Sequence, residues 1–402
     1  MNYDEALSWL HGKQNFGVKL GLGTTHRLLE AVGRPERGLR FMHVAGTNGK
    51  GSTCAMLDSV LRRAGIHSGL YTSPHLLDFR ERIRADGAMI APQDAAEGLT
   101  LLREASEGWE QPPTFFELAT VLAAWWFARR RVDVVVWETG MGGRLDATNA
   151  VTPIVSVITP ICLDHKEWLG PTIADIARET AGIIKPGIPV VSAPQDLAAQ
   201  AALEARARET GSELRFVSKP YDAELGLPGP HQRWNAAVVI AALDAAGFAK
   251  DPAARREGLR DVEWPARFQR LDGNLVVDGA HNEHAMSALV DAWRAAFGET
   301  KAQLVFGAMR DKESRRLLAI LRGIADEVWL VPVRSPRASS AEDLLPMARE
   351  AGFRIIRHGT VADALGTVRA SKSPALVTGS LFLAAEVLAL ADGQALPLPS
   401  AQ

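Results

Sequence analysis

The chain has 402 residues, of which 47% are hydrophobic and 23% charged, values typical of a soluble globular protein with two or three domains. The formal net charge of −2 gives no general electrostatic reason to bind nucleic acid or an anionic membrane. Two cysteines are too few for a disulfide framework and favour a reducing compartment. The acidic N-terminus and the short or interrupted apolar runs predict neither a signal peptide nor a membrane span.

Strand and helix patterns alternate through the first 260 residues. We expect strands at 40–45, 67–72, 132–138, 153–159 and 188–193. Helices are expected at 51–65, 115–131 and 173–187, the last closed by Pro186 and Gly187. This alternation predicts a mostly parallel sheet that is covered on both faces by helices.

The alternation restarts near residue 273. Five further strands are expected, at 274–280, 302–308, 327–333, 353–358 and 374–380. They predict a smaller, Rossmann-like α/β domain of ordinary size. We therefore divide the chain into a first domain at 1–262, a linker at 263–272 and a C-terminal domain at 273–402.

The sequence HVAGTNGKGST, at 43–53, lies between a predicted strand and a predicted helix. Glycines in such a loop let backbone amides approach phosphate oxygens at the helix N-terminus, and Lys50 is placed to neutralise β and γ phosphates. The stretch departs from the usual phosphate-loop pattern because Gly51 separates Lys50 from Ser52. A glycine-rich turn with a surface lysine is the alternative, but the context favours a phosphate site.

A second glycine cluster, ETGMGGRLDATN, follows the strand predicted at 132–138. Leu145 stands where the third glycine of a dinucleotide fingerprint belongs, which argues against a nicotinamide oxidoreductase. Glu138 ends the strand at the sheet edge where ligands of α/β proteins collect, so its carboxylate is a candidate Mg²⁺ ligand. A helix-capping or salt-bridged glutamate is the alternative.

Further polar side chains follow neighbouring strands at the same predicted edge. Ser73 follows the strand at 67–72, and His165 follows the strand at 153–159. A histidine there serves as a ligand or general base, although a packed or exposed histidine is equally compatible. Three arginines, Arg80, Arg82 and Arg84, could meet an anionic substrate, and a solvated basic face is their alternative.

The motifs together resemble those of the folylpolyglutamate synthase/dihydrofolate synthase family, which belongs to the Mur ligase superfamily. They are HVAGTNGKGST, TSPHLLDFRERIR, TFFE, ETGMGGRLDATN, LDHKEWLG, HQRWNAA, WPARFQRL, DGAHN and VTGSLFLAAEV, in that order. The resemblance runs from FGVKLGL, at 16–22, to AAEV, at 384–387. It implies a P-loop ATPase-like first domain, a C-terminal glutamate-ligase domain, and ATP and Mg²⁺ as cofactors.

The resemblance also implies residue roles. The ATP contacts would be Asn48, Gly49, Lys50, Gly51, Ser52, Thr53, Asn235, Arg267, Asp278 and His281. The metal ligands would be Ser73, Glu138 and His165, and Lys50, Glu138 and His165 would be catalytic. The dihydropteroate contacts would be Thr114, Phe115, Phe116, Glu117, Leu145, Asp146 and Ala147. The two phenylalanines suit stacking on a flat ring, and core packing at a helix start is their alternative.

The implied reaction is amide formation by way of an acyl phosphate. Its partners would be small molecules, namely L-glutamate, dihydropteroate and reduced folates, with no nucleic acid and no membrane. Closure of the two domains is expected to exclude water from the acyl phosphate. A cytoplasmic monomer is expected. The rival interpretations are another Mur-type amino-acid ligase, and a P-loop ATPase or binding protein that has lost ligase activity.

The chain departs from the family at Thr180. Family members usually carry a carbamylated lysine in REKAGI, where this chain reads RETAGI. Lys185, five residues on, matches a different family lysine and is not the missing one. We expect a ligase that does not depend on bicarbonate, with Thr180 at an open cleft edge where its hydroxyl could bond a metal-bound water and a lysine would fit. Arg80 is a lesser departure, in FRERI for the usual FNERI.

Overall fold

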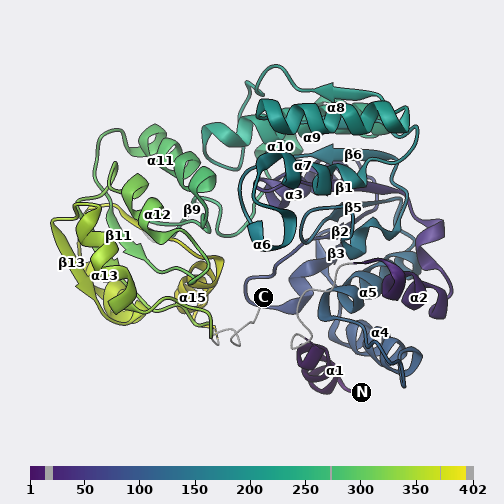
Figure 1. Cartoon of the computed structure of the whole chain (residues 1–402), viewed down its shortest axis with the longest axis horizontal. Helices are drawn as coiled ribbons and strands as arrows, with labels where there is room; N and C mark the ends of the chain where they lie inside the picture. The colour runs from purple at the N-terminus through teal and green to yellow at the C-terminus, as the bar shows by residue number, and fades with distance from the viewer. Residues whose placement is uncertain (14–20, 272–273, 372, 395–402) are drawn as a thin grey trace. The chain divides into compact units, whose positions relative to one another are not determined.

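The computed structural model describes residues 1–13, 21–271, 274–371 and 373–394, and the chain divides into two compact units (Figure 1). The first unit comprises Met1–His75, Phe79–Gly226 and Arg233–Val262. The second comprises Leu76–Asp78, Leu227–Gln232 and Glu263–Gln402. Residues 16–20 of the first family motif, residue 272 of the predicted linker, and residues 273, 372 and 395–402 of the predicted C-terminal domain lie outside the described residues.

In the described part of the first unit, eight strands form one sheet in the order β4-β3-β2-β5-β1-β6-β7-β8. The strands are β1 (Phe41–Ala45), β2 (Ser68–Tyr71), β3 (Ile83–Ala85), β4 (Ala88–Met89), β5 (Val134–Glu138), β6 (Val155–Ile158), β7 (Val190–Ser192) and β8 (Leu214–Phe216). Pairing is parallel from β2 to β8, and only β3 and β4 run antiparallel. The loops after β2, β5, β1 and β6 therefore leave the sheet at one edge.

Helices surround this sheet (Figure 1). They are α1 (Tyr3–His11), α2 (Gly23–Ala31), α3 (Lys50–Arg63), α4 (Pro92–Ala105), α5 (Phe115–Arg130), α6 (Lys166–Leu169), α7 (Ile173–Thr180), α8 (Leu197–Thr210), α9 (Pro230–Ala246) and α10 (Pro252–Arg260). Short 3-10 turns are η2 (Pro35–Gly38), η3 (Phe79–Arg82), η4 (Ala147–Ala150) and η5 (Ala181–Ile183). Helix α3 packs between the sheet and α10, and α5 is apolar on all sides because α2, α4 and the sheet enclose it.

In the described part of the second unit, six strands form a sheet in the order β13-β12-β11-β14-β10-β9. They are β9 (Gln269–Arg270), β10 (Leu275–Val277), β11 (Gln303–Phe306), β12 (Glu327–Leu330), β13 (Ile355–His358) and β14 (Ala375–Thr378). Its helices are α11 (Glu283–Phe297), α12 (Ser314–Leu321), α13 (Ala341–Glu350), α14 (Val361–Ala370) and α15 (Leu381–Ala391). Two apolar clusters cover the sheet, and all pairs are parallel except β9 with β10.

These two α/β units confirm the predicted fold class. One predicted element is wrong in extent: the helix expected at 173–187 ends at Thr180 and continues only as η5. Within η5 the chain packs closely against the loop after β5, because a Cβ at Gly182 would overlap with the backbone of Arg144. Within the stretch predicted as a linker, Gln269 and Arg270 form β9 and pair with β10.

Candidate functional site

The loop after β1 has the geometry of a phosphate cradle. Gly46 and Gly49 have φ angles of 138° and 87°, which favour glycine. A Cβ at Gly46 would overlap with the Thr159 hydroxyl, and one at Gly49 would lie 2.8 Å from Asn235 Oδ1. Asn235 is buried, so the side chain predicted to contact ATP lies directly against this loop. Both glycines are therefore required by backbone shape and by close packing.

Helix α3 begins immediately after this loop, at Lys50. The first amides of a helix have no carbonyl within the helix to bond, and its dipole favours an anion at that end. The ammonium of Lys50 donates to Gly46 O at 3.0 Å and Thr47 O at 3.4 Å, which holds the positive charge over the loop. In the same first turn of α3, Thr53 is fully buried, and its Oγ1 has no hydrogen-bond partner. These features fit a bound polyphosphate.

The loop after β1 is fastened to the loop after β6. The amides of Thr47 and Asn48 donate to Pro160 O at 2.9 and 3.2 Å. Thr47 Oγ1 also donates to Cys162 O at 3.0 Å and accepts from Cys162 N at 2.9 Å. Burial raises the pKa of the Cys162 thiol to about 12, so this cysteine is a neutral packing group. The amide of Asn48 is thus committed to the protein.

Glu138 ends β5, beside Val44 of β1, and only 2% of its surface is exposed. Its Oε2 accepts the Ser73 amide at 2.9 Å, so two of the three predicted metal ligands lie together. Burial raises the pKa of the Cys54 thiol on α3, and the Glu138 carboxylate raises it further. Glu138 therefore lies near enough to α3 to act on this thiol. Carboxylate and hydroxyl oxygens are donors that Mg²⁺ prefers.

His165, the third predicted metal ligand, lies on the loop after β6 at the same sheet edge. It has a φ of 50° and is exposed, immediately before α6. Among the described residues, no group of three or more His, Cys, Asp or Glu side chains is arranged to hold a metal ion. Of the three predicted ligands, Ser73 and Glu138 are joined by a direct hydrogen bond in the structure.

Arg82 is a residue whose position the sequence did not reveal. A solvated basic face was its alternative, yet only 1% of its surface is exposed. Its Nε donates to His75 Nδ1 at 2.8 Å, and its guanidinium lies 5.2 Å from the Phe115 ring centroid. Burial lowers the pKa of Arg82 to about 10, while Tyr71 and Glu138 act in the opposite direction. Arg82 is thus a buried cation close to the predicted metal ligand.

The residues predicted to contact dihydropteroate fall into two groups. Thr114 and Glu117 form a capping box at the start of α5: Glu117 Oε2 accepts the Thr114 amide at 2.8 Å and its hydroxyl at 2.9 Å. Phe115 is buried in the core against His11 and Phe79. Phe116 is only partly buried, and its ring lies against Gly140. Of the two phenylalanines, it is therefore the one whose ring is partly accessible to a ligand.

Asp146 holds the glycine cluster after β5 in shape. One carboxylate oxygen accepts the amides of Gly140 and Met141 at 3.0 and 2.9 Å, and the other accepts the amide and hydroxyl of Thr148. Burial raises the pKa of Asp146, and these hydrogen bonds oppose that shift. Ala147 is buried beside it, and Leu145 is partly exposed. Asp146 therefore has a structural task in this loop whatever else it binds.

In the second unit, Asp278 follows β10 and is buried. Burial raises the pKa of Asp278, and the nearby Arg267 guanidinium lowers it. His281 Nδ1 lies 2.9 Å from Gly279 O on the same loop. Three predicted ATP contacts are thus close together at the carboxyl end of one strand of the second sheet, where ligands of α/β sheets collect.

Residues 266–381 match the family described as Mur ligase, glutamate ligase domain. The chain is 35% identical to the dihydrofolate synthase/folylpolyglutamate synthase of Bacillus subtilis over 421 residues, which cover 96% of this chain and 98% of that protein.

The chain belongs to the folylpolyglutamate synthase/dihydrofolate synthase family. Solved structures of the family agree. The folylpolyglutamate synthase of Thermotoga maritima has a TM-score of 0.85 and 33% identity, covering 97% of this chain and 96% of that one. Escherichia coli FolC in complex with DHPP and ADP has a TM-score of 0.88 and 31% identity, covering 98% of each chain. Membership confirms the resemblance seen in the motifs and the enzyme class, an ATP-dependent ligase.

Thr180 stands where family members usually have lysine, and its surroundings differ from those we expected. Only 1% of its surface is exposed, and its hydroxyl donates to Ile176 O at 2.8 Å within α7. Its carbonyl oxygen would lie 2.7 Å from a Cβ at Gly143. The expectation of an open cleft edge is therefore wrong, and so is the expectation that a lysine fits there without cost. The hydroxyl is also committed to the helix backbone, so it is not aimed at a metal-bound water.

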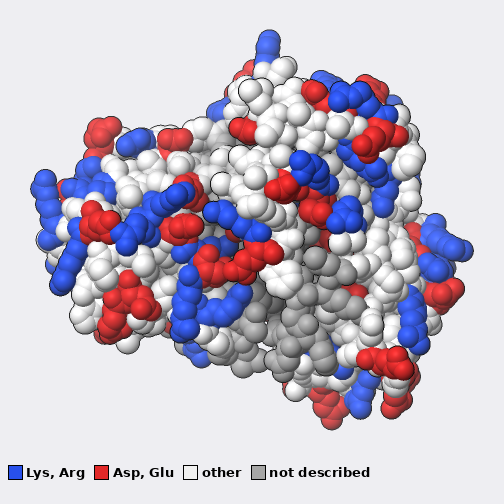
Figure 2. Space-filling model, viewed as in Figure 1, with Lys and Arg blue, Asp and Glu red and all other residues white. Residues whose placement is uncertain are grey.

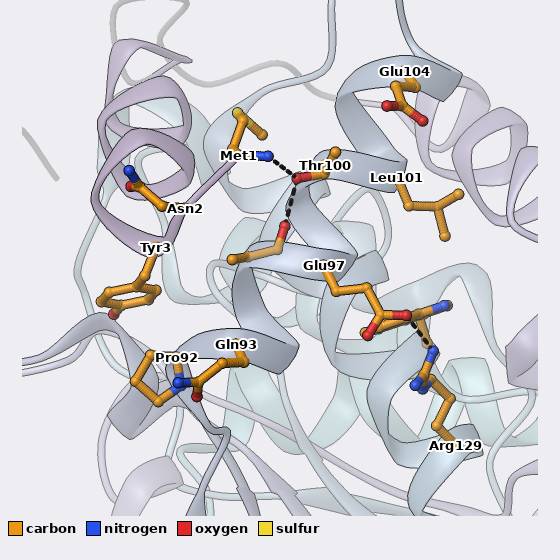
Figure 3. A pocket seen from close by; sticks show the side chains of 12 residues that line it. Met1, Asn2, Tyr3, Pro92, Gln93, Glu97, Thr100, Leu101, Glu104 and Arg129 are labelled. Carbon is orange, nitrogen blue, oxygen red and sulfur yellow. Dashed lines mark hydrogen bonds and ion pairs between the residues drawn. The ribbon is translucent and has the colours of Figure 1, made fainter.

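A pocket of about 730 Å³ lies elsewhere in the first unit, between the N-terminal segment and α4 (Figure 3). Its polar groups largely satisfy one another: the Met1 ammonium donates to Thr100 Oγ1 at 3.0 Å, and Arg129 pairs with Glu97. None of the residues predicted to bind ATP, metal or dihydropteroate lines this pocket. The pocket therefore has no part in the site built on the sheet edge.

Proposed function

We propose that this chain is an ATP-dependent ligase that joins the amine of L-glutamate to a carboxylate of dihydropteroate and of folates, and so extends poly-γ-glutamates. The observation that carries the proposal is the edge of the first sheet, where a glycine-bounded helix N-terminus with Lys50 and the Glu138–Ser73 pair occur in a member of this family. A nucleotide site and oxygen donors for a divalent cation at one edge suit phosphoryl transfer to a carboxylate.

The reaction has two steps. A carboxylate oxygen of the acceptor attacks the γ-phosphorus of ATP, the bond to the bridging oxygen breaks, and ADP leaves an acyl phosphate behind. The amine of L-glutamate then attacks the acyl carbon. The tetrahedral intermediate gives up the amine proton and expels inorganic phosphate, so that an amide remains. The protein contributes positioning and charge neutralisation rather than covalent chemistry.

In this proposal the residues of the first unit hold the transferring phosphoryl group. The loop 46–53 binds the polyphosphate through amides of its helix N-terminus, and Lys50 moves from the loop carbonyls to the phosphate oxygens. Ser73, Glu138 and His165 would hold Mg²⁺, which when bound withdraws charge from those oxygens. Arg267, Asp278, His281 and Asn235 would complete the ATP contacts.

Both synthase activities are proposed for the one site. Phe116 and Leu145 are partly exposed members of the predicted dihydropteroate set, and an aromatic face suits stacking on a pteridine ring. The internal hydrogen bonds of Thr114, Glu117 and Asp146 fix the segments that would line such a pocket. We further propose a cytoplasmic monomer whose partners are small molecules. Its cysteines are unpaired, and acidic and basic side chains are interspersed on the face in view in Figure 2.

Release of ADP tests this function. We expect full release with ATP, Mg²⁺, L-glutamate and dihydropteroate together, and almost none when either the amino acid or the acceptor is omitted. A folate substituted for dihydropteroate should also support release. ADP release that ignores both substrates would instead support an ATPase without ligase activity, and turnover with another amino acid or acceptor would support another Mur-type ligase.

The second expectation is that turnover does not depend on bicarbonate. Thr180 has no amine to carbamylate, and its hydroxyl is bonded to Ile176 O. Steady-state turnover in CO₂-depleted buffer should therefore be unchanged when bicarbonate is added. A strong, reversible requirement would mean that another lysine carries a carbamate. Lys185, whose Nζ donates to Asn149 O at 3.1 Å, is the first to replace by glutamine in that case.

A further inference from the structure

Two aromatic side chains contact Thr148, in the loop after β5. His43 of β1 and Trp137 of β5 are opposite each other in the parallel pair, so both side chains project from the same face of the sheet. Trp137 Nε1 donates to Thr148 O at 3.0 Å, and His43 Nε2 lies 2.9 Å from Thr148 Oγ1. All three residues are at most 1% exposed. The strand that leads into the phosphate loop is thus bonded to the second glycine cluster.

The hydrogen bonds of Asp146 decide which atoms donate at this contact. Its carboxylate accepts three backbone amides, those of Gly140, Met141 and Thr148. The Thr148 hydroxyl, 2.5 Å from Asp146 Oδ1, therefore donates its single proton to that carboxylate. The hydroxyl oxygen is left to accept, so His43 carries its proton on Nε2. A chain of two hydrogen bonds then runs from His43 through Thr148 to Asp146.

The other ring nitrogen of His43 shows that the imidazole is unfavourable in one respect. With the proton on Nε2, the bare Nδ1 is an acceptor, and it has no hydrogen-bond partner among the described residues. A buried acceptor without a partner destabilises a fold, and an apolar side chain would avoid that loss. Burial and the nearby Lys185 cation lower the pKa of His43 to about 3, so the ring is neutral and keeps a single N–H. The bond to Thr148 is therefore what the imidazole contributes.

The Asp146 carboxylate extends this chain to the segments predicted to bind dihydropteroate. Its Oδ2 accepts the amides of Gly140 and Met141 at 3.0 and 2.9 Å, which closes the loop after β5 on itself. Gly140 lies against the Phe116 ring, since a Cβ on Gly140 would be 2.6 Å from Phe116 Cζ. Phe116 and Leu145 are the partly exposed members of the predicted dihydropteroate set. The shape of this loop therefore sets where both of them lie.

We propose that His43 is a positioning residue for the acceptor substrate: its Nε2–H directs the Thr148 hydroxyl to Asp146 and so holds the loop after β5 in the shape that binds dihydropteroate. The proposal rests on the proposed function in assigning that loop to dihydropteroate. His43 is buried and acts through Thr148 rather than by touching the ligand. Loss of its N–H should weaken acceptor binding and spare ATP, which serves as the internal reference because β1 also leads into the phosphate loop.

The test compares two amide side chains at position 43. His43→Gln places its amide nitrogen near the position of Nε2 and can still donate to Thr148, whereas the shorter His43→Asn reaches only to the position of Nδ1. Dihydropteroate is titrated calorimetrically in the presence of ADP and Mg²⁺, and ATP is titrated alone. The asparagine variant should bind dihydropteroate roughly tenfold more weakly, and the glutamine variant within about threefold of wild type, because only the first loses the bond. Both should keep wild-type ATP affinity.

Changes at Thr148 show whether the effect passes through its hydroxyl. Thr148→Val keeps the shape of the side chain and removes the Oγ1 that links His43 to Asp146, while Thr148→Ser keeps that oxygen. Valine should weaken dihydropteroate binding and serine should not. The double variant His43→Asn/Thr148→Val should be no weaker than either single variant, since both changes break one chain. The pair at Thr148 keeps the proposal testable if His43→Asn does not fold.

Three outcomes overturn the proposal. They are wild-type dihydropteroate affinity in His43→Asn, an equal loss of ATP affinity, which would indicate general damage to β1, and additive losses in the double variant, which would mean that His43 acts by packing. A wild-type protein that binds dihydropteroate but releases no ADP with L-glutamate present refutes the proposed function, while the titrations still decide the role of His43. A wild type that binds no dihydropteroate overturns both.

Discussion

Replacement of Lys50 by alanine is expected to lower ligase turnover ~10²- to 10⁴-fold, because the variant loses the charge that neutralises the transferring phosphoryl group. The fold should survive. The Lys50 ammonium bonds only to loop carbonyls, at 3.0 Å to Gly46 O and 3.4 Å to Thr47 O among the bonds described, and Lys50 is half-buried at the first position of α3. Those carbonyls can be hydrated once the ammonium is gone.

The measurement is kcat/KM for ATP with L-glutamate and dihydropteroate saturating, together with the thermal midpoint. Lys301→Ala is a matched control, because Lys301 also donates to a backbone carbonyl, Gly323 O at 2.9 Å. Lys301 belongs to the second unit and is distant in sequence from the ATP contacts predicted for that unit. The control should keep wild-type turnover. If the kcat/KM of Lys50→Ala stays within about threefold of the wild-type value, the assignment of the loop is refuted, because losing a transition-state contact costs more than that.

Glu138→Gln should be the second severe variant. Glutamine keeps the size of the side chain and can still accept the Ser73 amide, which now bonds Glu138 Oε2 at 2.9 Å. It loses the negative charge that a hard divalent cation requires. We expect turnover to fall ~10²-fold or more at moderate Mg²⁺, with partial recovery at high Mg²⁺, since the lost charge stabilises the metal that activates the phosphoryl group.

The deciding measurement is the Mg²⁺ dependence of the initial rate. Asp58→Asn is the control for losing a buried carboxylate that has no predicted metal role. Asp58 is 3% exposed and accepts hydrogen bonds from Ser68 and Arg62. That control should melt at lower temperature and keep the wild-type Mg²⁺ dependence. If Glu138→Gln also keeps it, Glu138 is not a metal ligand and its burial has another explanation.

The sequence predicted the elements that carry the site because their patterns are local. The apolar runs at 40–45 and 132–138 became β1 and β5, and the glycine loop between strand and helix has the expected positive φ angles at Gly46 and Gly49. Parallel pairing then placed the loops after these strands at one edge. Periodicity and glycine spacing are sufficient for such inferences, since both report backbone geometry.

Side-chain roles were less accessible because they depend on contacts distant in sequence. Arg82 could not be distinguished from its exposed neighbours, yet it is enclosed by His75 and Phe115. Thr180 is buried, and its carbonyl oxygen lies close to Gly143, a contact that a motif match does not reveal. Thr114 and Glu117 do carry a local signal, the three-residue spacing of a capping box, and that spacing would have predicted their mutual hydrogen bonds.

The bonds between loops of the first sheet have a consequence for the energetics of binding. Thr47 is tied to Cys162, and the Arg144 amide donates to Glu179 O at 2.7 Å, so the loops after β1, β5 and β6 are connected to neighbouring segments by the protein itself. Their conformational entropy has already been lost during folding. A nucleotide therefore meets a preorganised surface, and little of its interaction energy is consumed in ordering the chain.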